Sequence, residues 1–397
     1  MKHALFLLGF LAAFPAYAGP MADALERAWA RHPLAGADPA RQEEARARSE
    51  LAAAATPGPA AVSLAHLNDR LGSNRGRQEW EVEVAVPLWL PGQKAARGVE
   101  ADAGLAEVSA RRQALRLQLA GELREAWWTL AAAREAHDLA RHRLAGASDL
   151  ETDVLRRYQA GDLARVDANL ARNERLAAET EALEADAAQA RAEQAWRALT
   201  GTSAPASLPA EQPPPAAGDT AHGHPRLDAL AAAARLAQAR LKTVMATRRD
   251  APELAMRLVR ERSDANDPYG NSLGVRLNIP LSGEARVRHD SAAARAEAAQ
   301  ADAELVLARH GLELETARAH REIDAAERQL ALAAERRALI ADNLSLAEKS
   351  FALGEADLTS LLRARATARE TEAAQARSRI ARDAAFSRLR QALGVLP

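Results

Sequence analysis

The sequence predicts a mainly helical chain made of a duplicated helix–β-hairpin–long helix unit, with the hairpins contributing to a membrane β-barrel. Three observations predict this fold class. Landmarks in the sequence recur about 193 residues apart, and about 65 residues after each expected hairpin contain no proline. The second strand of each hairpin alternates apolar and polar side chains. Because a fixed internal period makes half of the chain the unit to explain, each element is assigned twice.

The repeat is defined by paired landmarks. Pro87-Leu88 recurs as Pro280-Leu281, and Tyr158-Gln-Ala-Gly161 recurs as Phe351-Ala-Leu-Gly354, both 193 residues later. Between these landmarks a seven-residue row recurs in the same register, and such a row predicts a seam at which helices pack and supercoil. The row consists of Leu119, Ala126, Ala133, Ala140 and Ala147 in the first half, and Leu312, Ala319, Ala326, Ala333 and Ile340 in the second.

The first 18 residues have the pattern of a secretory signal peptide. A basic start at Lys2-His3 and an apolar stretch precede the small-x-small site Ala16-Tyr17-Ala18. The stretch is too short for a membrane anchor, so we expect an exported chain cleaved before Gly19. No later stretch approaches the roughly 20 apolar residues of a spanning helix. The absence of cysteine excludes disulfides, thiolate metal sites and an N-terminal lipid on cysteine.

The charges are balanced, with 53 Lys+Arg against 54 Asp+Glu, so nothing indicates binding to nucleic acid. Charged residues make up 27% of the chain and alternate with alanine and leucine, a composition typical of long helices and coiled coils. Aromatic residues, at 4%, are too few for a large core packed with rings.

The first repeat is assigned to residues 19–201. A helix over 21–55 breaks near His32-Pro33, a hairpin follows at about 60–90, and a long helix is expected at about 94–158. The first strand, 60–71, is poorly patterned. The second is clear, because Trp80, Val82, Val84, Val86 and Leu88 alternate with Glu81, Glu83 and Ala85. At 1.5 Å per residue the long helix would measure about 100 Å. After a bend, a returning helix covers 163–200, and a Pro-rich linker covers 202–221.

The second repeat, residues 222–397, follows the same order. A helix at 225–249 leads to a hairpin at about 252–282, and a long helix is expected at about 284–351. The bend at 351–357 precedes a closing helix to about 393. The second hairpin strand is the clearest in the chain: Leu273, Val275, Leu277, Ile279 and Leu281 alternate with Gly274, Arg276 and Asn278.

Strands of about ten residues with one apolar face have the length and pattern of tilted strands in a membrane barrel. Four strands cannot close a barrel, and an open edge cannot lie in lipid. Three copies would supply twelve strands, with Trp80, Trp89 and Tyr269 near the interfaces. Two soluble hairpins packed on helices are the alternative. For the helices, a tunnel wet on both walls and an ordinary antiparallel coiled coil fit the pattern equally well.

The residues resemble those of the TolC-type outer-membrane efflux protein family over nearly the whole mature chain. The segment from Leu346 to Leu358 is similar to the family's second bend, and Tyr158-Gln-Ala-Gly161-Asp162-Leu163 is its counterpart in the first repeat. His32-Pro33 and His224-Pro225 resemble the paired helix starts. The strand exits at Pro87 and Pro280 also fit the family. The segment Pro87-Leu-Trp-Leu-Pro91-Gly-Gln-Lys94 is closest to the branch associated with heavy-metal resistance-nodulation-division pumps.

The resemblance implies a homotrimer with a twelve-stranded barrel in the outer-membrane lipid and a helical tunnel across the periplasm. Its inner end would dock on a periplasmic adaptor (a membrane fusion protein) coupled to an inner-membrane pump of resistance-nodulation-division type. The function implied is a passive conduit for small solutes, metal ions among them. In the family the bends contact the adaptor, so the resemblance assigns adaptor docking to two groups of residues here: Gly161, Asp162 and Leu163 at the first bend, and Gly354, Glu355 and Ala356 at the second. The simpler interpretation, that each glycine only caps the C-terminus of its long helix, holds for both bends and is compatible with docking.

Charged residues near the bends suggest an aperture gate. In a closed tunnel they could pair across neighbouring helices, and each pair would matter only as part of a ring. A solvated helix face is the alternative for any one of them. The set is Arg156, Arg157, Arg165, Asp167, Asp357, Arg363 and Arg365. Reversal of the charge at Asp167 or Asp357 is expected to make the pore leaky.

No motif indicates catalysis: the sequence has no nucleophile motif, Gly-rich phosphate loop or clustered carboxylate pair, so no enzyme and no cofactor is expected. His222-x-His224 could bind a metal, but a solvated linker and a helix start explain the pair better. Two other classes stay open. A periplasmic adaptor would have one helical hairpin between β domains rather than two. A secreted structural coiled coil would have no membrane strands.

Overall fold

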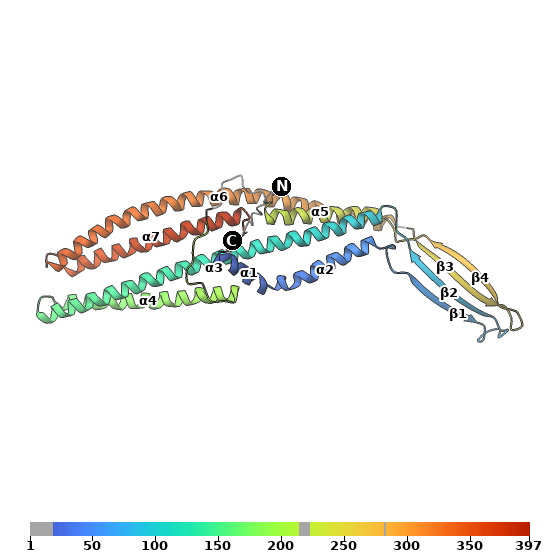
Figure 1. Cartoon of the computed structure of the whole chain (residues 1–397), viewed down its shortest axis with the longest axis horizontal. Helices are drawn as coiled ribbons and strands as arrows, with labels where there is room; N and C mark the ends of the chain where they lie inside the picture. Colours follow the sequence, from blue (N-terminus) through green and yellow to red (C-terminus); the bar gives the residue numbers. More distant parts are fainter. Residues whose placement is uncertain (1–18, 214–222, 282) are drawn as a thin grey trace, which may run out of the picture. The chain divides into compact units, whose positions relative to one another are not determined.

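The computed structural model describes residues 19–213, 223–281 and 283–397. The predicted signal peptide therefore lies outside the described residues, as do Ser282 and the end of the linker. The order of elements is helix, β-hairpin, long helix and returning helix, and it occurs twice (Figure 1). This confirms the duplicated unit. Among the described residues, no helix combines the length and the apolar character needed to cross a bilayer.

The first repeat contains α1 (Pro20–Arg31), α2 (Pro33–Ala53), β1 (Ala61–Asn68), β2 (Gln78–Pro87), α3 (Gln93–Ala160) and α4 (Arg165–Thr200). The second contains α5 (Pro225–Ala246), β3 (Glu253–Arg262), β4 (Gly270–Asn278), α6 (Glu284–Ala352) and α7 (Leu358–Ala392). The break predicted near His32-Pro33 separates α1 from α2.

The chain folds into two compact units that cut across the two repeats. Among the described residues, unit 1 combines 19–32 with 118–213 and 316–397, and unit 2 combines 33–117 with 223–281 and 283–315. Each unit therefore contains part of both repeats. The hairpins belong to unit 2, whereas both helical bends belong to unit 1.

The four strands of unit 2 form one antiparallel sheet in the order β1-β2-β3-β4, so the two hairpins pair through β2 and β3. The register places Val62 opposite Val84, Val84 opposite Met256, and Met256 opposite Val275. An apolar row thus crosses all four strands. Within this sheet β1 and β4 are the edge strands.

The sheet carries its apolar side chains on an exposed face. Val82, Val84, Leu258 and Leu273 are all exposed, the last at 69%. The opposite face bears Glu83, which is 7% exposed and pairs with Arg276. Glu81 lies 3.7 Å from Arg257 on the same face. A sheet in a soluble protein shows the reverse arrangement, with its apolar side chains covered and its charged side chains facing water.

Two strand ends differ from the prediction. The alternating pattern continues to Leu281, but β4 ends at Asn278, because Pro280 has no N–H to donate to the ladder. The weakly patterned first strand is ordered as β1. It ends at Asn68 rather than at 71, and the ring of its His66 stacks on Trp80 with centroids 4.0 Å apart.

Unit 1 is built around aromatic and alanine packing between helices of both repeats. Trp127 of α3 packs against Trp196 of α4 with ring centroids 5.5 Å apart, and both are buried. The indole N–H of Trp128 donates to Ser387 of α7 at 2.9 Å. Every member of the two predicted seven-residue rows is buried or half-buried, which confirms that the rows lie in helix contacts.

Candidate functional site

Both bends of unit 1 end their long helices in the same way. Gly161 has φ +89°, its N–H donates to the carbonyl of Tyr158 at 3.0 Å, and the Asp162 N–H donates to Arg157 at 2.9 Å. This is the Schellman pattern, in which a left-handed residue lets two backbone donors reach the last turn of the helix. Glycine adopts that conformation without a steric penalty.

The second bend repeats these bonds 193 residues later. Gly354 has φ +77° and donates to the carbonyl of Phe351 at 3.1 Å, and the Glu355 N–H donates to Ser350 at 2.8 Å. The expected C-cap glycines are therefore confirmed in both repeats. The duplication extends to the individual hydrogen bonds of the turn.

The returning helices begin differently in the two repeats. Asp357 caps α7, and its carboxylate accepts the Ser360 N–H at 2.8 Å. The equivalent position in the first repeat is Ala164, which has no side-chain acceptor. There the carboxylate of Asp167 accepts the Ala164 N–H at 3.1 Å instead. Each aspartate thus stabilises a helix N-terminus within its own chain.

The two bends are held together by an apolar cluster. Its buried members come from both helical hairpins, and the guanidinium of Arg157 lies 5.2 Å from the ring centroid of Phe351 across the two repeats. The cluster fixes both bends at one end of unit 1. It consists of Leu150, Val154, Ala168, Ala171, Phe351, Leu358 and Leu361.

The predicted docking residues differ in their exposure. Gly161, Asp162, Gly354 and Glu355 are exposed, whereas Ala356 is half-buried. Leu163 is half-buried and packs against the apolar cluster of the bends. Sequence reasoning missed Leu353, which is 74% exposed directly beside Gly354. An apolar residue at the last turn of an amphipathic helix looks like a core residue in the sequence.

The predicted gate residues divide into three groups. Asp167 and Asp357 cap helices, as described above. Arg156 and Arg157 both pair with Asp153 of the same helix, the Nε of Arg157 at 3.0 Å. The others come from α4 and α7: Arg165 is exposed without an ion pair among the described residues, and Arg365 lies 3.0 Å from Glu348.

Arg365 interacts beyond its own helix, whereas Asp357 is engaged within the helix that it caps. Arg365 also donates to the backbone carbonyl of Gly146 on α3 at 3.4 Å, which links the second helical hairpin to the first. The Ser360 hydrogen bonds hold the pKa of Asp357 below its usual value, and the charge of Arg363 adds to this lowering. In one chain the aspartates are thus engaged locally, and a gate ring between chains stays a prediction.

One charged link between the helical hairpins was not predicted. Glu174 of α4 pairs with Arg143 of α3 at 3.1 Å and with Arg369 of α7. Partial burial lowers the pKa of Arg143, but Glu174 and Glu181 more than offset this and raise it above its usual value. The partners are 31 and 195 residues from Glu174. No local pattern in the sequence signals such a pairing.

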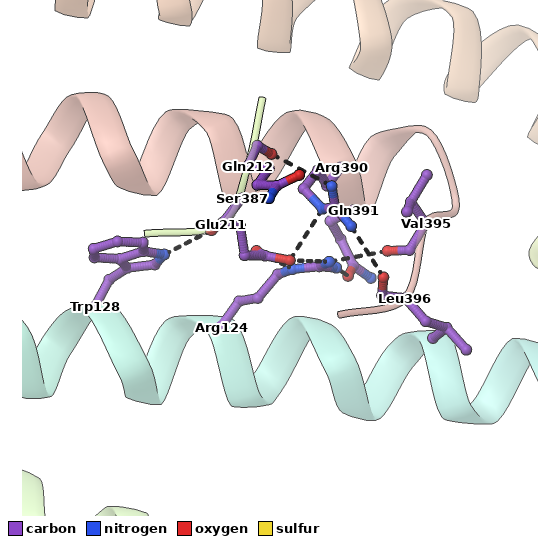
Figure 2. A network of polar contacts seen from close by, with 9 residues as sticks. All are labelled: Arg124, Trp128, Glu211, Gln212, Ser387, Arg390, Gln391, Val395 and Leu396. Carbon is purple, nitrogen blue, oxygen red and sulfur yellow. Dashed lines mark hydrogen bonds and ion pairs between the residues drawn. The ribbon is translucent and has the colours of Figure 1, made fainter. Parts of the chain in front are cut away.

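A second unpredicted feature is a buried charge network in unit 1 (Figure 2). Glu211, in the segment after α4, accepts from Nε and Nη2 of Arg124 at 2.8 Å each. It also accepts from Nε of Arg390 on α7 at 3.1 Å. The two arginines further donate to the carbonyls of Val395 and Leu396. The network therefore fastens the inter-repeat segment and the end of the chain to α3 and α7.

Burial makes this network sensitive to the charge of Glu211. The side chains of Arg124 and Glu211 are 4% and 8% exposed. Burial alone would raise the pKa of Glu211, but the hydrogen bonds and charge of Arg124 outweigh it and hold the pKa below its usual value. The carboxylate is thus ionised, as a bidentate partner of arginine must be.

The described residues contain no group of three or more His, Asp or Glu side chains that could hold a metal ion. Of the histidine pair singled out in the sequence, His222 lies outside the described residues. His224 caps α5, and its Nδ1 accepts the Arg226 N–H at 3.2 Å. Burial, reinforced by the charge of Arg226, lowers the pKa of this histidine.

Comparison with known proteins adds a family match. Residues 224–395 match the model of a family described as outer membrane efflux protein. The match covers the second repeat from the start of α5 to beyond the end of α7. No curated protein matches the chain.

Solved structures with this fold align over almost the whole chain. The outer membrane protein VceC of Vibrio cholerae has a TM-score of 0.76 at 17% identity, over 94% of this chain and 96% of that one. CusC, described as forming a transmembrane channel, has a TM-score of 0.76 at 15% identity, over 94% and 92%. The CmeC outer membrane channel of Campylobacter jejuni has a TM-score of 0.75 at 13% identity, over 94% and 85%.

Proposed function

We propose that this chain, whose residues 224–395 match the model of the outer membrane efflux protein family, belongs to that family and is one subunit of a homotrimeric efflux channel. The channel is a passive conduit that carries small solutes from an inner-membrane pump across the periplasm and the outer membrane. Membership of the family indicates the outer membrane as its location. Export by the predicted signal peptide, and anchoring without an N-terminal lipid, complete the proposal.

The observation that carries the proposal is the inside-out sheet of unit 2. Its exposed face bears Val84, Met256 and Val275 in one row across the strands, and its opposite face bears the Glu83–Arg276 pair. In water this arrangement would leave a broad apolar surface uncovered. Against lipid on one side and a wet lumen on the other, both faces are satisfied.

The trimer follows from the edges of this sheet. β1 and β4 each present an unpaired row of backbone donors and acceptors to the outside of the four-stranded sheet. Such edges are not tolerated in lipid. Pairing β4 of one copy with β1 of the next satisfies them, and three copies give the twelve strands of a closed barrel.

The bends carry the proposed docking and gating. Gly161, Asp162, Gly354 and Glu355 expose backbone and carboxylate groups at the end of unit 1, where an adaptor hairpin can reach them. Leu163 and Ala356 support these turns from within. The exposed Leu353 adds an apolar contact to this docking surface. The charged side chains around the bends, Asp357 and Arg365 among them, are proposed to ring the aperture in the trimer.

Partners and cargo are part of the proposal. A periplasmic adaptor and a resistance-nodulation-division pump suit the resemblance of the strand exit at Pro87 to that branch. CusC shares the fold at 15% identity, which supports no choice of cargo. We propose no enzymatic activity, because a conduit needs none.

Electrical recording tests the proposal. The protein is extracted from outer membranes and inserted into a planar lipid bilayer. A channel subunit produces discrete conductance steps, and fractionation places it in the outer membrane with heat-modifiable migration. A chain that is recovered as a soluble periplasmic monomer and gives no conductance would refute the function.

A further inference from the structure

The apolar face of the sheet in unit 2 carries two positive charges near the hairpin turns. Side chains two residues apart lie on the same side of a strand, so Arg260 and Arg262 of β3 continue the face of Met256 and Leu258. The pairing of β2 with β3 places Trp80 opposite Arg260 on this face. The two arginines therefore follow directly after the apolar rows.

These arginines stand apart from the other charges of the sheet. Neither forms an ion pair among the described residues. The register places every other Asp, Glu, Lys and Arg of the four strands on the opposite face: Glu79, Glu81, Glu83, Glu253, Arg257, Glu261 and Arg276. The apolar face thus has two cations beside each other and no acidic strand residue to neutralise them.

The ring of Tyr269 orders both guanidinium groups. Its centroid lies 4.6 Å from Cζ of Arg260 and 5.0 Å from Cζ of Arg262, within the range of cation–π contacts. The Tyr269 hydroxyl donates to the side chain of Gln78 at 2.6 Å, and Nε of Arg262 donates to the Gly76 carbonyl at 3.1 Å. The terminal nitrogens of both arginines have no acceptor among the described residues, so they are available to a ligand.

The arginines occupy only one end of the apolar face. In unit 2 the strands join the helices at one end of the sheet, and the hairpin turns lie at the other (Figure 1). At the helix end the same face finishes with the apolar row Val86, Leu254 and Leu277. An arginine that only reached for water would suit either boundary of a membrane. With the helices in the periplasm, the arginines lie at the outer boundary alone.

We infer that Arg260 and Arg262, ordered by Tyr269, bind the phosphate groups of lipopolysaccharide, the glycolipid of the outer leaflet. The inference rests on the proposed function, because only a place in the outer membrane brings lipid to this face. A guanidinium group matches phosphate with two parallel hydrogen bonds. The acyl chains of the same molecule would lie along the apolar rows that begin at Leu258, which is 52% exposed. The site therefore fits both parts of one amphipathic ligand.

Lipid titration of the purified particle in detergent tests the site. We would measure the binding of diphosphorylated lipid A by native mass spectrometry to wild type and to the variant Arg260→Gln/Arg262→Gln. The variant should bind roughly tenfold more weakly or worse, because one hydrogen bond to a charged group contributes about that factor. Lipid A without its phosphates should bind wild type as weakly as the variant binds the phosphorylated form.

A matched control is Arg257→Gln/Arg286→Gln, which also removes two charges from unit 2. Arg257 is on the opposite face of β3 and Arg286 is on α6, with side chains 48% and 72% exposed, so this variant should bind lipid A like wild type. The Arg260→Gln/Arg262→Gln particle should keep the mass and the conductance steps of wild type, which shows that it is folded.

The outcomes separate the site from the proposed function. If wild type gives conductance steps but binds phosphorylated lipid A no better than the Arg260→Gln/Arg262→Gln variant does, the site is overturned and the function stands. Equal binding of the two forms of lipid A to wild type also overturns it. So does displacement of the lipid by inorganic phosphate at the same concentration, because the site would then recognise a free anion. A wild-type particle without conductance removes the proposed function, and the lipid site with it.

Discussion

Removal of the Glu211 carboxylate should destabilise unit 1 more than removal of any exposed acid. The change Glu211→Ala leaves Arg124, which is 4% exposed at its side chain, without its bidentate partner. It also removes the contact to Arg390 at 3.1 Å. An uncompensated buried charge is the costly outcome of breaking a buried pair.

The expected loss is about 3–5 kcal/mol in the free energy of unfolding, the range measured when one partner of a buried pair is removed. The control Glu372→Ala breaks an exposed pair with Arg337, in which the side chains are 50% and 46% exposed. There the loss should stay below about 1 kcal/mol. The difference between the two variants isolates the effect of burial.

Fluorescence-detected guanidinium unfolding in detergent is a suitable assay, because Trp127, Trp128 and Trp196 are all buried in unit 1. The variant Arg124→Met/Glu211→Met should recover a large part of the loss, since it removes two of the buried charges together. Equal midpoints for Glu211→Ala and Glu372→Ala would refute the reasoning. So would a double variant less stable than Glu211→Ala.

The same network predicts a pH dependence. The pKa of Glu211 in the folded chain lies below its value of 4.5 in the unfolded chain. The stability that it contributes is therefore fully present above pH 4.5 and is lost as the pH falls through the folded pKa. Glu211→Gln should flatten this acid limb of the unfolding midpoint against pH, and an unchanged limb would contradict the assignment.

Four further outcomes are expected. Asp357→Lys should raise the resting single-channel conductance. Asp357→Asn removes the charge but keeps an oxygen that can cap α7, so it separates the role in the gate from the role in the cap. If the conductance of both variants equals that of wild type, Asp357 is not part of the gate. Gly354→Ala should lower the free energy of unfolding by about 1–2 kcal/mol, because alanine is strained at a φ of +77°. No atom lies within 4 Å of the added Cβ, so the loss reports backbone strain and not a clash. Gly146→Ala, inside α3, should instead raise the free energy of unfolding, and a Gly146→Ala variant less stable than Gly354→Ala would contradict the argument. Leu361→Ala, at a site 2% exposed, should cost about 2–5 kcal/mol by the same assay, and a loss below 1 kcal/mol would mean that the cluster does not hold the bends. His224 has a lowered pKa in the folded chain, so the stability that it contributes is fully present above pH 6.5 and is lost as the pH falls through the folded pKa; His224→Asn should abolish that acid limb.

Features with a local signature could be predicted from the sequence. The strand alternation at Trp80–Pro87 identifies β2 because a membrane-facing strand needs one apolar face. Gly161 and Gly354 identify the bends because a left-handed residue is required there. The seven-residue rows identify helix contacts because a helix presents the same face at that interval.

Features that depend on distant partners could not be predicted. Arg124 and Glu211 are 87 residues apart, and neither position differs from other charged positions in the sequence. The sequence places Asp167 in the gate set because it lies near a bend, yet its carboxylate accepts a hydrogen bond from the Ala164 N–H at the start of its own helix. In the heptad pattern a leucine on an outer edge, such as Leu339, looks the same as one in the core. Its 64% exposure emerges only when the helices are placed.

The number of chains in the outer-membrane particle tests the central claim most directly. Two hairpins per chain supply four strands, and a closed twelve-stranded barrel requires three copies. Native mass spectrometry of the particle, extracted in mild detergent, should give the mass of three mature chains, and brief heating should release monomers. A particle of one or two chains, or a chain found only in the soluble periplasmic fraction, would contradict the account.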